Sequence, residues 1–347
     1  MKTLLGMNPA ELAEVAANIG VRPFAAKQMA AWLYKKGART IDEMTDLPKA
    51  ARAKLTEQGY TIGREDPIAE ARSIDGTAKY LFNGVGGRDI EAVYIPDHDR
   101  ATLCISSQAG CKMACRFCMT GRGGWQGNLT AGAIINQVLS VPESDKLTNI
   151  VFMGMGEPTD NIDAVLRAVE ILTSDWGMAW SPRRITVSTI GKQPGLNRLL
   201  DETRVHIALS LHTPFAGERS DIMPVEKAFP LRDIMPVLRA HDFAHQRRLS
   251  MEYTMFRGLN DDEKHASALA RLIKGTSARV NLIRFHRIPG FEGEPSSRQA
   301  MEQFRDKLND AGITATIRAS RGEDIMAACG MLAGAKGQNN LNDNTNE

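Results

Sequence analysis

Three cysteines stand close together in this sequence, at Cys111, Cys115 and Cys118. Their C-x3-C-x2-C spacing puts three thiolates on one short loop, which leaves one iron of a cuboidal iron–sulfur cluster without a protein ligand. An open iron can bind a small molecule, and S-adenosylmethionine (SAM) is the usual one for this spacing. Phe117, directly before the last cysteine, is positioned to shield the cluster from water.

A zinc site is the alternative that the same residues leave open. Cys104 lies seven residues before Cys111, so four thiolates are available for one zinc ion. Zinc sites more often use two close pairs of ligands separated by a longer spacer, and the spacing therefore favours the cluster. A zinc ion would suit a non-catalytic RNA-binding protein.

Composition bounds the class of protein. The 347 residues, 43% hydrophobic and 24% charged, suffice for one large α/β domain and a small accessory domain. No apolar run approaches the length of a membrane span, and Glu11 and Glu14 interrupt the N-terminal stretch where a secretion signal would be apolar. An odd number of cysteines, five, with three of them in one short cluster, argues against a secreted disulfide framework. We expect a monomeric, cytoplasmic protein without a membrane partner.

Residues 1–65 predict a small helical accessory domain. Apolar spacing indicates helices from Pro9 towards Gly20, over 23–36 and over 48–57. Ten Lys and Arg against seven Asp and Glu give this segment a charge of +3. That charge is compatible with docking onto RNA phosphates, although charge alone favours an ordinary solvated helical surface.

Residues 66–100 change to the alternation typical of strands. The segments 68–73, 78–82 and 90–95 are separated by the turn dipeptides at 75–76 and 86–87. We expect a short β-hairpin or antiparallel sheet that links the helical domain to the core.

Residues 101–333 alternate strand and helix. The expected strands are 102–106, 149–153, 184–188, 205–211, 249–253 and 280–284. Repeated β-α units predict a parallel sheet with helices outside, and six units favour a partial (β/α)6 barrel over a doubly wound flat sheet. In either fold, ligands bind at the carboxyl ends of the strands, where the cysteine loop begins. The small, polar tail at 334–347 is predicted to be disordered.

Polar residues follow several of these strands. Glu157, before Pro158, can accept hydrogen bonds from the ammonium group of SAM. Ser188 ends the next strand, and Ser210 to His212 end the one after. A single polar residue at a strand end more often only caps the strand. We infer a binding site here because several consecutive strands end in such residues.

Two cysteines, Cys104 and Cys329, remain outside the triplet. A buried cysteine is commonly a small hydrophobic residue. Two such thiols are also what a covalent mechanism with disulfide resolution requires.

Taken together, these motifs resemble the RlmN/Cfr family of radical-SAM adenine methyltransferases, from about Arg22 to Gly334. The matching motifs are 100–108, the cysteine triplet, 152–158, 210–212 and 324–330.

The resemblance implies a two-step methylation that consumes two SAM molecules. One SAM would methylate Cys329, and a second, bound to a [4Fe-4S] cluster on the triplet, would be cleaved reductively to a radical that removes a hydrogen from this methyl group. The resulting carbon radical would add to an adenine ring. Cys104 would then attack the sulfur of Cys329 and release the product, and Glu91 stands where the family has a proton acceptor.

The resemblance also implies a set of SAM contacts. They are Glu157, Pro158, Ser188, Ser210, Leu211 and His212. His286 stands where the family generally has an asparagine that contacts SAM, and an imidazole can make one such bond.

Two products are known in the family, methylation at C2 of adenine and methylation at C8, the latter an antibiotic-resistance activity. Pro158 is typical of the C2 branch, although the run at 281–284 resembles both branches. We expect C2 methylation of 23S rRNA near the peptidyl-transferase centre and of a tRNA anticodon loop. A flavodoxin-type protein is the expected electron donor.

Overall fold

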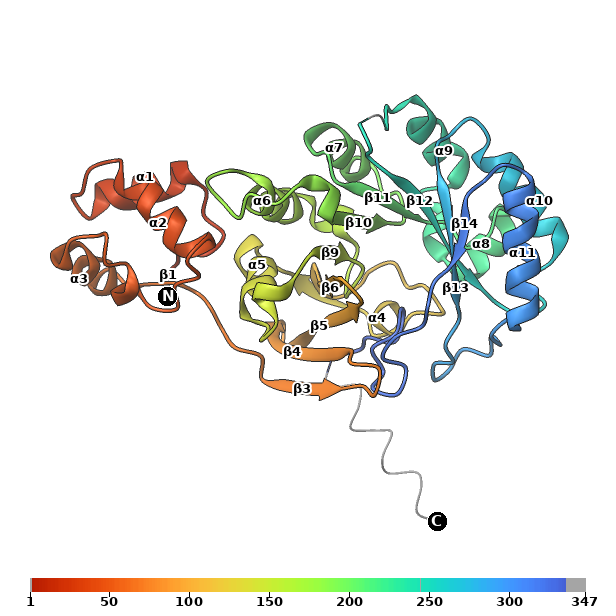
Figure 1. Cartoon of the computed structure of the whole chain (residues 1–347), viewed down its shortest axis with the longest axis horizontal. Helices are drawn as coiled ribbons and strands as arrows, with labels where there is room; N and C mark the ends of the chain where they lie inside the picture. Colours follow the sequence, from red (N-terminus) through yellow and green to blue (C-terminus); the bar gives the residue numbers. More distant parts are fainter. Residues whose placement is uncertain (1, 244, 335–347) are drawn as a thin grey trace, which may run out of the picture.

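The computed structural model describes residues 2–243 and 245–334; the tail predicted to be disordered lies almost wholly outside the described residues. The N-terminal segment forms a small helical unit, drawn in red at one end of Figure 1. Its helices are α1 (Pro9–Asn18), α2 (Ala25–Tyr34) and α3 (Lys49–Glu57). Asn8 begins α1 with a capping box, because its side chain accepts from the Glu11 amide while the Glu11 carboxylate accepts from the Asn8 amide.

The helical unit is closed by two strands and rests against the core. Strand β1 (Lys2–Thr3) pairs in parallel with β2 (Tyr60–Thr61), a pairing that local patterns did not reveal. Arg167 on the core forms an ion pair with Glu11 at 2.7 Å, and the Glu65 amide donates to the Asn136 side chain at 3.0 Å. One hydrophobic core runs through both parts.

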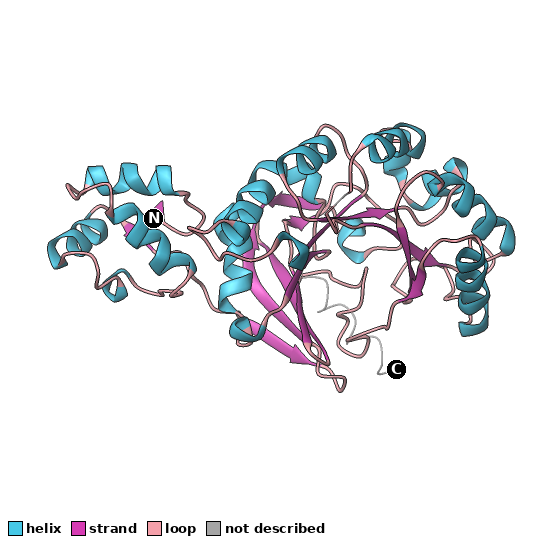
Figure 2. Cartoon of the chain, turned by 45° about the horizontal axis from the view of Figure 1, so that its top comes forward, coloured by secondary structure: helices cyan, strands magenta, loops and turns pink. Residues whose placement is uncertain are grey.

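Among the described residues, seven parallel strands form most of one sheet, in an order that follows the chain. They are β6 (Arg100–Cys104), β9 (Asn149–Phe152), β10 (Ile185–Thr189), β11 (His206–Ser210), β12 (Leu249–Met255), β13 (Arg279–Arg284) and β14 (Ala315–Ile317). The order never reverses, so a doubly wound sheet is excluded and the partial barrel is confirmed. Figure 2 shows the strands curving around an open interior, with helices outside.

The outer layer consists of one amphipathic helix after most strands. These helices are α5 (Ala131–Ser140), α6 (Ile162–Thr173), α7 (Gly195–Glu202), α9 (Leu231–Ala240), α10 (Glu263–Ile273) and α11 (Arg298–Asp310). Two shorter helices, α4 (Met119–Arg122) and α8 (Ala216–Ile222), lie in loops. No helix in residues 2–243 or 245–334 is both long and apolar enough to cross a membrane.

Three antiparallel strands continue the barrel wall beyond β6. They are β3 (Ala69–Arg72), β4 (Ala78–Val85) and β5 (Arg88–Asp97), and β5 pairs with β6 so that Val93 lies opposite Cys104. The segment expected to form a linker sheet is therefore continuous with the main sheet. This extension brings Glu91 of β5 beside the end of the first parallel strand.

A small hairpin encloses the cysteine loop. Strand β7 (Gln108–Gly110) pairs with β8 (Trp125–Asn128), and the cysteines and α4 lie between them. Sequence analysis did not anticipate this hairpin. It fixes both ends of the loop, so the three thiols have a rigid base.

Candidate active site

The three triplet cysteines lie at the carboxyl end of the barrel. They line one cavity, here called the rim cavity, together with Glu157, Ser188, Ser210 and His212. The loop turns sharply at Ala114, whose φ is 53°, and the Arg116 amide is held by the Ile222 carbonyl at 2.9 Å. Residues predicted from separate strand ends are thus brought together.

The surroundings of the triplet suit an iron–sulfur cluster. Apolar side chains around the thiols include Met113, Phe117, Met223, Phe256 and Phe285. Burial raises the pKa of Cys111 to about 12 and also raises the pKa values of Cys115 and Cys118. Thiolates in such a place need a neighbouring cation, and a metal cluster supplies that charge.

A single-metal site fits this geometry less well. In the part of the chain that the structure describes, no three His, Cys, Asp or Glu side chains converge as one metal ion requires. Cys104, the fourth ligand of the zinc alternative, does not line the rim cavity. A cuboidal cluster instead distributes its cysteines over separate irons.

Two glycines let the end of β9 approach its neighbours. A Cβ on Gly154 would lie 2.7 Å from the Ile105 carbonyl oxygen, and one on Gly156, whose φ is +100°, would lie 2.6 Å from the Gln108 side chain. Only glycine is accommodated at either place without displacing a neighbour. The backbone before Glu157 therefore forms the floor of the rim cavity.

Glu157 is almost fully buried at the edge of the rim cavity, and its carboxylate already accepts hydrogen bonds from the protein. Its carboxylate accepts hydrogen bonds from the Thr159 and Thr189 hydroxyls, both at 2.6 Å, and from the Ile190 amide at 3.0 Å. Burial raises the pKa of Glu157, although these bonds oppose the shift. Oε2 accepts one of these bonds and can accept another from a ligand. Pro158 begins the short helix η3 (Pro158–Asn161), which fixes the turn.

Alternation along the backbone explains the arrangement at the end of β11. Ser210 and His212 line the rim cavity, while Leu211 between them is buried and does not. The Ser210 hydroxyl lies 3.4 Å from that of Ser188 on the next strand. The His212 Nδ1 accepts from the Thr254 amide, and burial lowers the pKa of this imidazole to about 3, so the ring is neutral.

The two remaining cysteines meet in an adjoining hollow, here called the thiol cavity, which Cys104, Cys118 and Cys329 all line. Cys329 also lines the rim cavity, so it stands between the triplet and Cys104. All five cysteines carry free thiols, and the expected disulfide is absent from this structure. His286 lines the thiol cavity rather than the rim cavity, with its Nδ1 3.1 Å from the Glu323 carboxylate.

Glu91 does not line either cavity; it holds the segment that follows Cys329. Its carboxylate pairs with Lys79 at 3.1 Å and accepts from the amides of Ala333 at 2.8 Å and Gly334 at 3.1 Å. The Glu91–Lys79 pair is buried. Its negative charge is therefore kept in place beside the loop of Cys329.

Two arginines near the site escaped sequence analysis. Arg219 is fully buried, pairs with Glu226 and donates to the carbonyls of Ser210 and Leu211, so it holds the end of β11. Arg318 lines both cavities and lies 3.4 Å from Glu252. Its position one residue beyond β14 is a strand-end signal, but nothing in the sequence pointed to Arg219.

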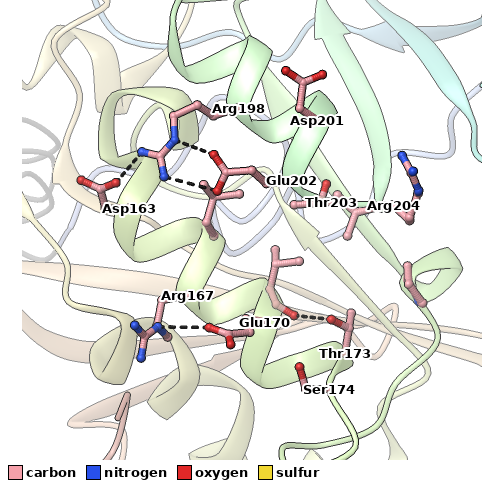
Figure 3. A pocket seen from close by; sticks show the side chains of 14 residues that line it. Asp163, Arg167, Glu170, Thr173, Ser174, Arg198, Asp201, Glu202, Thr203 and Arg204 are labelled. Atoms are coloured by element: carbon pink, nitrogen blue, oxygen red, sulfur yellow. Dashed lines mark hydrogen bonds and ion pairs between the residues drawn. The ribbon is translucent and has the colours of Figure 1, made fainter. Parts of the chain in front are cut away.

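A separate polar groove lies outside the barrel between α6 and α7 (Figure 3). Arg198 there pairs with both Asp163 and Glu202. None of the candidate residues from the sequence lines this groove.

Comparisons with known proteins agree with this geometry. Residues 2–60 match the family described as "Ribosomal RNA large subunit methyltransferase N-terminal domain", and residues 105–270 match the radical SAM superfamily. The chain is 56% identical, over 96% of its length and 97% of the relative's, to a "Probable dual-specificity RNA methyltransferase RlmN" from Parabacteroides distasonis.

More distant relatives extend the match. A "Dual-specificity RNA methyltransferase RlmN" from Syntrophobacter fumaroxidans is 42% identical, covering 94% of this chain and 96% of the relative. A crystal structure of a radical SAM methyltransferase from Sphaerobacter thermophilus superposes with a TM-score of 0.89, at 40% identity, over 96% of this chain and 99% of that one.

Proposed function

Because the chain belongs to the RlmN family of radical-SAM RNA methyltransferases, we propose that it methylates C2 of adenine in 23S rRNA and in the anticodon loop of tRNA. The observation that carries the proposal is the position of Cys329, which lines one cavity with the triplet cysteines and a second cavity with Cys104. A methyl carrier must face its methyl donor on one side and its resolving thiol on the other.

Cys111, Cys115 and Cys118 would hold the [4Fe-4S] cluster. When bound, the cluster and SAM supply the methyl group and the one-electron chemistry that activates it. Glu157, Ser188, Ser210 and His212 would bind and orient SAM by hydrogen bonds, with Pro158 fixing the turn beneath it. Leu211 would contribute through the backbone that holds its two neighbours, and His286 would act from the edge of the site.

Three protein groups would carry the covalent steps. The Cys329 sulfur takes the methyl group from SAM. This methyl group then loses one hydrogen atom and its carbon bonds to adenine C2, and loss of one electron leaves a methylene bridge; the one-electron chemistry of the cluster and SAM would account for both losses. A base removes the proton from C2; the family resemblance is the ground on which we infer Glu91, whose carboxylate would have to exchange its contacts with Lys79, Ala333 and Gly334 for the substrate. Cys104 as thiolate then attacks the Cys329 sulfur, the bond from this sulfur to the methylene carbon breaks, and the carbon takes up a proton to become the methyl group. The protein is left with a disulfide between the two cysteines, which an external thiol reductant must reduce.

The other participants follow from this chemistry. We infer a flavodoxin-type protein as the one-electron donor and a monomer as the working form. We also infer a reducing compartment, the cytoplasm, because thiolates and an oxygen-sensitive cluster persist there. The helical unit at residues 2–61, whose sequence matches the N-terminal domain of large-subunit rRNA methyltransferases, would dock structured RNA.

The proposal is tested by nucleoside mass spectrometry. Cluster-loaded protein is incubated anaerobically with SAM, a reductant and either 23S rRNA or tRNA, and the digested nucleosides are compared with standards. We expect 2-methyladenosine from both RNAs. The appearance of 8-methyladenosine would move the protein to the antibiotic-resistance branch, and the absence of methylated adenosine from tRNA would remove the second substrate.

A further inference from the structure

The opposite mouth of the barrel carries a ring of arginines. The amino ends of parallel strands meet there, and a second large hollow opens between them. Its arginines come from the ends of four strands of the sheet: they are Arg100 at the start of β6, Arg183 and Arg184 before β10, Arg248 before β12 and Arg279 at the start of β13. We call this feature the arginine mouth.

These charges are largely uncompensated. The hollow is also lined by Arg318, and its only acidic lining residues are Asp99 and Glu252, of which Glu252 lies beside Arg318 at 3.4 Å. The guanidinium groups of the arginine mouth make no ion pair with any residue in 2–243 or 245–334; Arg183 bonds only to the neutral side chain of Gln246, at 2.7 Å. Six cations therefore face two carboxylates.

The one imidazole in the hollow does not add to this charge. His206 accepts a hydrogen bond from the Arg248 amide at 2.9 Å, and burial together with the nearby Arg248 charge lowers the pKa of His206 to about 4. The ring is neutral at physiological pH and available as a hydrogen-bonding group.

Concavity distinguishes this mouth from an ordinary solvated basic surface. The five arginines are exposed, yet all of them line the same hollow. A hollow lined by one sign of charge concentrates its field on an entering ion. The neutral side chains on the wall are already engaged, because Ser250 and Asn281 donate to Glu252 and Thr316 donates to Asn281, so the arginines would supply the contacts to such an ion.

We propose that the arginine mouth binds a small phosphate-bearing anion, of the size of pyrophosphate or a nucleotide, at the end of the barrel opposite Cys329. Guanidinium groups match phosphate oxygens with paired, charge-assisted hydrogen bonds, which lysines cannot do. The site is concave and leads inwards, since Met153, Glu252 and Arg318 line both this hollow and the rim cavity. A long RNA whose base must reach Cys329 approaches from the other mouth.

The test is direct binding of pyrophosphate and ATP to the full-length, cluster-loaded protein by calorimetry. The decisive variant is Arg248→Gln with Arg279→Gln, which removes two neighbouring charges from the mouth. Because one pair of charged hydrogen bonds is worth more than 1.4 kcal/mol, we expect about tenfold or greater loss of pyrophosphate affinity. Methylation without added anion should be unchanged.

A matched control is Arg232→Gln with Arg305→Gln, which removes the same charge from the outer helices α9 and α11. It should bind pyrophosphate as the native protein does, and thermal unfolding should show that both double variants are folded. Absence of pyrophosphate and ATP binding to the native protein, or an equal loss in the control, would overturn the proposal. A loss of affinity for a non-substrate RNA oligonucleotide without any loss for pyrophosphate would assign the mouth to RNA instead.

Discussion

The two loops that carry the catalytic cysteines are held in opposite ways. The triplet loop is fixed by backbone pairing, because β7 and β8 close it and the Cys111 amide bonds to the Gly124 carbonyl at 3.0 Å. The Cys329 loop follows the last strand and has no strand partner of its own in the described chain up to Gly334. The cluster site is therefore built into the fold, and the methyl carrier is attached to it.

Side chains of the antiparallel wall make that attachment. Asp75 accepts from the Gly322 amide at 3.0 Å, Asp324 accepts from the Ser73 hydroxyl at 2.6 Å, and Glu91 holds the amides of Ala333 and Gly334. The anchors lie before and after Cys329, which is itself exposed. Between these anchors the loop also rests on the triplet loop, because the Gly330 carbonyl accepts from the Met119 amide at 2.7 Å and the Leu332 carbonyl accepts from the Thr120 hydroxyl at 2.6 Å.

Removing one cysteine from each loop tests most directly whether the two loops have different roles. Cys115→Ala should lose cluster iron and all product, since a cluster ligand is missing. Cys329→Ala should lose all product with full iron content and SAM binding, since only the carrier is missing. Iron and sulfide analysis with nucleoside mass spectrometry separates the two. Methylated RNA from the Cys329 variant would refute a methyl-cysteine carrier.

Removing the resolving thiol should stop the reaction one step later. In Cys104→Ala the cluster and Cys329 are retained, so methylene transfer proceeds but the bond to Cys329 cannot break. We expect a stoichiometric covalent protein–RNA adduct, visible by denaturing gel and mass spectrometry. Recovery of free RNA alone would contradict the assigned role, and the double variant with Cys329→Ala serves as the control because it should form no adduct.

The contrast between the loops also explains what the sequence could predict. The cysteine triplet, the glycines at 154 and 156 and the polar strand ends are local patterns, and they gave the cluster loop, the barrel and most of the rim cavity. Resemblance, not physical reasoning, paired Cys104 with Cys329. The anchors of the Cys329 loop join residues about 240 or more apart in the chain, such as Ser73 and Asp324, so no local pattern could reveal them.

The same limit applies to residues that sequence analysis missed and to the direction in which a predicted residue points its side chain. Arg219 is fully buried and donates to the carbonyls of Ser210 and Leu211, and a fully buried arginine has no signature in a single sequence. Leu211 belongs to the segment expected to contact SAM, and its side chain is buried in the core. A sequence motif identifies a segment, but the backbone conformation determines which of its side chains face the cavity.

Release from Cys329 should depend on pH. Burial and the neighbouring Cys329 raise the pKa of Cys104 to about 12, so little thiolate is present at neutrality. Because the thiolate fraction rises about tenfold per unit below the pKa, adduct decay should accelerate by about that factor from pH 7 to 8 and again to 9. Quenched single turnovers measure the decay, with adduct formation under the same conditions as the reference. A decay rate independent of pH would mean that a neighbouring base removes the Cys104 proton in the same step.

The smallest expected effect comes from loosening one anchor of the Cys329 loop. Asp324→Asn keeps an acceptor for the Ser73 hydroxyl or the Ile74 amide but removes the charge that strengthens both bonds. Because this contact is exposed and other anchors remain, we expect kcat to fall by roughly two- to fivefold with unchanged iron content. Limited proteolysis should cut the 319–334 segment faster, whereas a general loss of stability would also expose other segments to the protease.

The matched control is Asp306→Asn, which removes an exposed charge from the outer helix α11. If both variants lose the same activity, the Asp324 carboxylate is not an anchor on which catalysis by Cys329 depends.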